Sequence, residues 1–154
     1  MDRILKIALL DQIYSLFDDF ARLENVACER ECATCCTCNM TLTTLEGYKI
    51  ISLLDARAKS SLGQRIYAAV GQRRFKPQIT INHMAQHCMT GQEIPEEIID
   101  PAWGPCPLLF EKECPIYPIR PFGCRCMMSK THCADTGYAD IGEFTLTVAN
   151  LFNQ

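Results

Sequence analysis

Eleven cysteines constrain this chain more than any other feature of its sequence. Five lie between positions 28 and 38, five lie between 106 and 133, and Cys88 lies between the two clusters. An odd number of cysteines does not fit a complete disulfide framework. Reduced cysteines at such close spacing are typically metal ligands. The two clusters therefore predict a thiolate metal centre, because metal binding can order loops that contain little regular structure.

The spacing within each cluster suits metal chelation. The first cluster, residues 28–38, reads Cys-x3-Cys-x2-Cys-Cys-x-Cys, and a Cys-x2-Cys step brings two sulfurs to one side of a turn. Cys35 and Cys36 are adjacent, and neighbouring side chains of an extended chain point to opposite faces. They more readily serve two centres than one small ion. In the second cluster Cys106 and Cys114 each precede proline, as cluster cysteines often do in ferredoxins.

Length, charge and hydropathy limit the class of protein. The 154 residues fit a single domain spanning 1–154. A net charge of −3 offers no electrostatic surface for nucleic acid, and no apolar run is long enough to cross a membrane. The N-terminus lacks the pattern of a signal peptide. We therefore expect a cytoplasmic protein without nucleic-acid or membrane partners, and a protein partner is left open.

The apolar periodicity predicts a mainly α fold: a small helical domain with a cysteine-rich irregular metal-binding loop. The stripe from Leu9 to Leu23 indicates an amphipathic helix whose apolar face is core or a dimer contact. Thr43 and Glu46 form a capping-box pattern, and Ser60 or Ser61 is a candidate cap. The expected segments are an N-terminal helix over 2–24, helices within 44–90 (44–59, 60–74 and 80–89), an irregular loop over 101–137 and a helix over 144–152.

The second cluster carries a more specific pattern. It contains Cys106-Pro-Leu-Leu and Cys114-Pro-Ile-Tyr-x2-Arg-Pro-x2-Cys124-Arg. Together with the first cluster, this pattern resembles the CxxCxxCC family, which is described as a zinc- or iron-chelating domain. The resemblance implies a ligand set with Cys28 as a further member and Cys88 or Cys126 as the eighth. The core ligands that it implies are Cys32, Cys35, Cys36, Cys106, Cys114 and Cys124.

Two arginines of the same loop are candidates for binding the centre. Several thiolates around a metal leave net negative charge, which Arg120, Arg125 and Lys130 can offset. Arginine stays charged and offers several hydrogen-bond donors. The proline after Arg120 restricts its backbone to extended angles. We expect Arg120 to support the metal centre rather than to catalyse a reaction.

Several alternatives stay open at this stage. The adjacent cysteine pair and the Cys-Pro steps favour an iron–sulfur centre slightly over zinc. The protein is then a redox or accessory module, a zinc-stabilised interaction module without catalysis, or part of a protein-modifying enzyme system. Disulfides, a radical-SAM-like site at Cys28-x3-Cys32-x2-Cys35 and a zinc pair at His83 and His87 are weaker readings of the same residues. No nucleophile–base pair identifies an enzymatic reaction.

Overall fold

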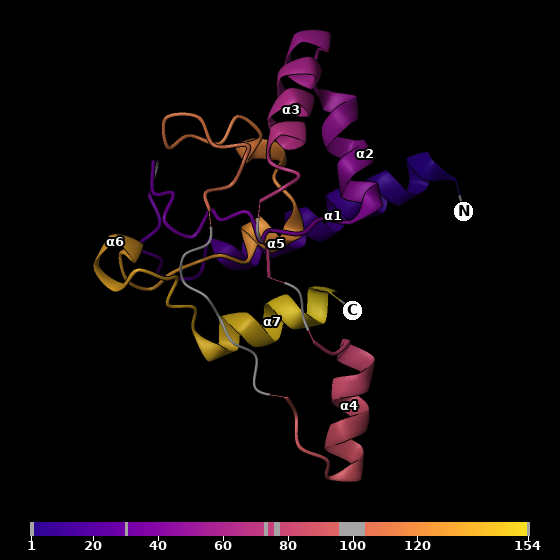
Figure 1. Ribbon diagram of the computed structural model, residues 1–154, viewed down its shortest axis with the longest axis vertical. Coiled ribbons are helices and arrows are strands. Elements are labelled where there is room, and N and C mark those ends of the chain that lie inside the picture. The colour runs from indigo at the N-terminus through magenta and orange to yellow at the C-terminus, as the bar shows by residue number, and fades with distance from the viewer. Residues whose placement is uncertain (1, 30, 73, 76–77, 96–103, 154) are drawn as a thin grey trace.

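A computed structural model describes residues 2–29, 31–72, 74–75, 78–95 and 104–153 (Figure 1). These residues form a mainly helical domain, as predicted, and their only β contacts are two isolated bridges. No helix among them is both long and apolar enough to cross a membrane. The elements in chain order are α1 (Arg3–Ala21), α2 (Thr44–Leu53), α3 (Ala56–Ala68), α4 (Ile81–Thr90), the 3-10 helix η1 (Tyr117–Ile119), α5 (Phe122–Arg125), α6 (Cys133–Thr136) and α7 (Glu143–Asn153).

The hydrophobic core lies where α1, α7 and the segment around α5 meet. Phe17 of α1 is fully buried. Its ring meets Phe122 at 4.8 Å and Phe152 at 5.6 Å between centroids, in edge-to-face arrangements. Met128 belongs to the same buried cluster. Because Phe122 and Met128 come from the second cysteine cluster, the core itself anchors that loop.

The apolar stripe of α1 divides between the core and the surface. Tyr14 and Phe17 are buried, but other members of the stripe remain exposed: Leu9 at 40%, Ile13 at 37%, Leu16 at 61% and Leu23 at 84%. Of the two expectations for the stripe, core or dimer contact, the first holds for only part of it. Helical periodicity identifies an apolar arc, but neighbouring elements decide which part of it they cover.

The helix boundaries follow the capping residues. Thr43 and Glu46 form the predicted capping box at the start of α2. The expected boundary near 59–60 is wrong, because α2 ends at Leu53 and Asp55 accepts a hydrogen bond from the Ala58 amide at 2.7 Å. Aspartate is among the strongest N-caps. With Asp55 as its N-cap, α3 begins at Ala56, before Ser60 and Ser61. α4 ends as predicted, with Gly91 in the left-handed conformation at φ 67°.

The expected irregular region contains three short helices, η1, α5 and α6, within its described part, 104–137. Each has only three or four residues, too few for apolar periodicity to be visible. The predicted helix near the C-terminus is confirmed as α7. The sequence Pro95-Glu96-Glu97 is also typical of a helical first turn, but Glu96 and Glu97 lie outside the described residues.

Candidate metal centre

Backbone hydrogen bonds join the two cysteine clusters directly. The Cys106 amide donates to the Cys36 carbonyl at 2.8 Å, and the Cys38 amide donates to the Gly104 carbonyl at 2.9 Å. Thr37 and Pro105 form an antiparallel bridge between these contacts. The junction brings together segments that lie about 70 positions apart in the sequence.

Four cysteines around this junction form what we call the four-thiol group: Cys36, Cys106, Cys114 and Cys124. A hydrogen bond from Cys35 lowers the pKa of Cys36, against the opposing effects of burial and of the other three sulfurs. Burial raises the pKa of Cys124 to about 12, and the neighbouring Cys106 and Cys114 add to that rise. Burial also raises the pKa of Cys114. The four thiols are therefore close enough to influence one another's ionisation.

Three further cysteines form what we call the three-thiol group: Cys32, Cys35 and Cys133. Burial raises the pKa of Cys32, and a hydrogen bond with Cys133 raises it further. Cys35 also hydrogen-bonds Cys133, and its own bond to Cys36 is the largest cause of its raised pKa. Cys35 therefore links the two groups. The Cys35 and Cys36 side chains hydrogen-bond each other, so they do not point to opposite faces as neighbouring side chains of an extended segment would.

Cys133 was not among the predicted ligands. It begins α6 and is only 1% exposed. The only signal in the sequence was its place in the same loop as Cys124. That proximity in sequence could not show that Cys133 meets the first cluster.

The remaining predicted ligands lie elsewhere. The Cys28 sulfur accepts a hydrogen bond from the Ser129 amide at 3.3 Å. Cys28 therefore contacts the second-cluster segment. Cys126 packs against the hydrophobic core, where burial and the charge of Glu46 raise its pKa to about 11. Cys88 is exposed on α4, which stands away from the cysteine-rich loops in Figure 1. The structure thus does not bring Cys88 to either thiol group.

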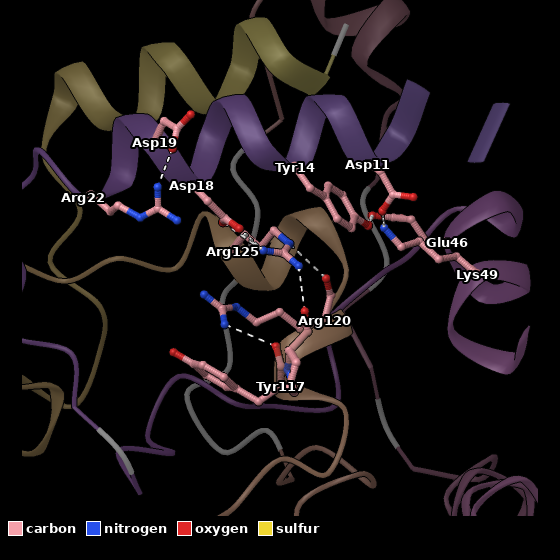
Figure 2. A network of polar contacts seen from close by, with 11 residues as sticks. Asp11, Tyr14, Asp18, Asp19, Arg22, Glu46, Lys49, Tyr117, Arg120 and Arg125 are labelled. Carbon is pink, nitrogen blue, oxygen red and sulfur yellow. Dashed lines mark hydrogen bonds and ion pairs between the residues drawn. The ribbon is translucent and has the colours of Figure 1, made fainter. Parts of the chain in front are cut away.

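The two predicted arginines have different surroundings (Figure 2). Arg125 is buried, and its guanidinium bonds both carboxylate oxygens of Asp18 at 2.8 and 2.7 Å. It also donates to the Pro118 carbonyl at 3.1 Å and lies over the Tyr14 ring, 4.2 Å from its centroid. Arg125 therefore fastens the second-cluster loop to α1.

Arg120 lies nearer the cysteines. It stacks on the Tyr117 ring at 3.9 Å and donates to the Tyr117 carbonyl at 3.3 Å. Its positive charge opposes the rise in the pKa values of Cys114 and Cys124. Arg120 is thus the arginine placed to stabilise charge on the four-thiol group.

Glu46 hydrogen-bonds the first residue of α5, the short helix that carries Cys124. Its carboxylate is buried and accepts hydrogen bonds from the Tyr14 hydroxyl, the Phe122 amide and the Thr43 amide, each at 2.7 Å. Burial alone would raise the pKa of Glu46, but these donors outweigh it and lower the pKa. Burial, followed by the bond to Glu46, raises the pKa of Tyr14. The network connects α1, α2 and the helix that carries Cys124.

The candidate metal ligands at this site are cysteine thiols. All eleven cysteines are free, and thiolates suit zinc and iron–sulfur clusters. Even so, within the part of the chain that the structure describes, no three cysteine, histidine or acidic side chains already converge in a geometry that could hold a metal ion. The predicted histidine pair lies apart on α4, where His87 meets the Glu93 carbonyl at 2.9 Å. The site is thus a collection of neighbouring thiols rather than a preformed cage.

No family profile, curated protein or solved structure matches this chain.

Proposed function

We propose that this chain is a cytoplasmic metal-binding protein that holds an iron–sulfur centre or zinc through both cysteine clusters. The observation that carries the proposal is the four-thiol group. One of its members comes from the first cluster and three come from the second. Backbone hydrogen bonds from Cys106 to Cys36 and from Cys38 to Gly104 join the two segments. The free state of all eleven cysteines and the sequence resemblance to a metal-chelating family support the same reading.

Four thiols are the complement of a tetrahedral zinc ion or of one iron–sulfur cluster. The three-thiol group adjoins them through Cys35. Seven thiols exceed the needs of one tetrahedral ion, so the expected content is two zinc ions or one multi-iron cluster with spare thiols. In this proposal Cys133 contributes to the site, whereas Cys88 and Cys126 do not.

Binding would require the thiols to lose protons and to turn toward the metal. Metal ligation deprotonates coordinating thiols and makes affinity depend on pH. Burial raises the pKa of Cys124 and so disfavours its thiolate when no cation is present. A bound cation reverses that preference. Arg120 would contribute by stabilising the negative charge that remains around the metal.

Three roles are compatible with such a centre. A redox or accessory role follows if the centre is an iron–sulfur cluster. A zinc ion would instead indicate an interaction module without catalysis. Membership of a protein-modifying enzyme system is the third possibility, for which the chain offers no assigned catalytic residue. A brown protein absorbing near 400 nm distinguishes the first role from the second.

The test is metal analysis of protein made with iron and zinc available and purified without oxygen. We expect at least one equivalent of metal, and we expect Cys106→Ser and Cys36→Ser each to lower it. Cys88→Ser is the matched control and should retain the parent's metal content. Less than about half an equivalent in the parent protein would reject the proposal, since a structural thiolate site at pH 7 binds its metal tightly. Equal loss in Cys88→Ser would reject the assignment of the ligands.

A further inference from the structure

Helix α4 carries a second set of metal-binding side chains, separate from the cysteine clusters. Met84, His87 and Cys88 occupy positions i, i+3 and i+4 of this helix. Residues at these spacings are neighbours on a helix surface, with Cβ atoms about 5–6 Å apart. Met84 therefore lies one turn before both His87 and Cys88. We call these three residues the α4 triad.

The α4 triad is accessible to solvent. Met84 is 39% exposed, Cys88 is exposed and His87 is partly exposed. The helix stands away from the cysteine-rich loops in Figure 1, and no member of the four-thiol or three-thiol group lies on it. An ion can therefore reach the α4 triad independently of the metal centre proposed above.

His87 is oriented as metal-binding histidines commonly are. Its Nδ1 atom lies 2.9 Å from the Glu93 carbonyl oxygen. Because a carbonyl oxygen can only accept a hydrogen bond, Nδ1 is the donor, and the neutral ring keeps its Nε2 lone pair for a ligand. Histidines that bind metals almost always donate their other ring N–H to a carbonyl, a carboxylate or water. This contact therefore prepares Nε2 for coordination.

Caps at both ends fix the backbone of α4 before any metal binds. The Thr80 side chain accepts a hydrogen bond from the His83 amide at 3.2 Å, and Gly91 ends the helix in the left-handed conformation at φ 67°. A site built on a regular helix holds its ligands more precisely than a site on a loop. The spacing of the α4 triad is thus set by the helix itself.

The donor atoms of the α4 triad select a soft ion. They are one thioether, one imidazole nitrogen and one thiol, and α4 contains no aspartate or glutamate. Calcium and magnesium ions require oxygen ligands, whereas thioether and thiolate sulfur favour Cu(I). We propose that the α4 triad binds Cu(I) through the Met84 sulfur, the His87 Nε2 atom and the Cys88 thiolate. Binding releases the thiol proton of Cys88, and the thiolate neutralises the single charge of the ion.

His83 belongs to a different pair. It lies one turn before His87 but five positions before Cys88, and residues five apart are separated by about 140° around a helix. His83 and Cys88 are therefore not neighbours, whereas Met84 neighbours both other members of the α4 triad. Methionine, rather than a second histidine, supplies the third donor.

Methionine-methyl NMR of the full, reduced chain tests the proposal, with Ag(I) as an air-stable probe of the same charge and similar softness. The six methionine methyl groups are labelled with carbon-13, so that Met84 and Met89 report from the same helix. Silver is added stepwise beyond the number of thiols, because the cysteine clusters also bind it. We expect the Met84 signal to shift and saturate. Met89 is 88% exposed but lies outside the α4 triad, so its signal should stay in place.

Variants test the ligand assignment. Cys88→Ser and His87→Ala should each raise the silver concentration that shifts Met84 by about tenfold or more. His83→Ala is the matched control, because it removes an exposed histidine of the same helix and should leave the response unchanged. Zinc added to the parent protein should not move the Met84 signal.

A Met84 signal that does not shift in excess silver, or an equal shift of Met89, would overturn the proposal. A parent-like response in Cys88→Ser, or loss of the response in His83→Ala, would reject the assigned ligands. An equal shift of Met84 with zinc would reject the preference for a soft monovalent ion.

Discussion

Glu46 offers the sharpest test of how this fold is held together. Its carboxylate receives the Tyr14 hydroxyl from α1, the Phe122 amide from α5 and the Thr43 amide from the start of α2. Glu46→Ala removes the shared acceptor and leaves the Tyr14 and Phe122 donors buried without a partner. Each unsatisfied buried donor costs about 1–3 kcal/mol, and loss of half the capping box costs up to about 1 kcal/mol more.

The expected loss is therefore about 3–5 kcal/mol, a large share of the 5–15 kcal/mol typical of a domain. With a urea m-value of about 2 kcal/mol per molar, the unfolding midpoint should fall by about 2 M. Glu46→Gln should lose less, because its carbonyl keeps one acceptor. Glu93→Ala, a change at an exposed glutamate, is the control. A midpoint in Glu46→Ala that matches this control would refute the role assigned to the network.

The same carboxylate predicts a pH dependence. Its pKa in the folded protein is lower than the usual 4.5. A group with a depressed folded pKa contributes its stability above the unfolded pKa and loses it as the pH falls through the folded value. The stability difference between the parent and Glu46→Gln should therefore be full at pH 6–7 and shrink as the pH falls below about 4.5. A difference that stays constant down to pH 3 would contradict this linkage.

Three further predictions concern the core and the arginines. Phe17→Ala should destabilise the protein by about 3–5 kcal/mol in urea unfolding, because Phe17 is fully buried among aromatic rings; a loss below about 1 kcal/mol would contradict this packing. Arg120→Ala should release metal to a competing chelator about 10–100-fold more readily, with Arg120→Lys intermediate. Arg125→Ala should instead lower stability by about 2–3 kcal/mol, since its guanidinium is buried against a partly exposed Asp18. Unchanged metal release in Arg120→Ala would reject its supporting role.

The sequence determined the type of fold because its signals are local. The capping box at Thr43 needs only residues three apart, and Gly91 ends α4 because it tolerates a left-handed backbone. The cysteine spacing likewise identified two thiol-rich segments and Arg120 as a neighbour of one of them. Asp55 could have been recognised as the start of α3, since aspartate is as strong a cap as serine.

The tertiary structure alone decided which residues meet. The sequence suggested Cys88 and not Cys133 as a ligand, yet Cys133 is buried beside Cys32 and Cys35 while Cys88 is exposed on α4. Arg120 and Arg125 are five positions apart in one loop, but packing turns Arg125 to Asp18 on α1. Likewise, α1 has a broad apolar arc, and only the positions of α5 and α7 determine that Phe17 is buried and Leu16 is not. Periodicity and spacing act over a few residues, whereas these contacts depend on segments that approach one another only after the chain has folded.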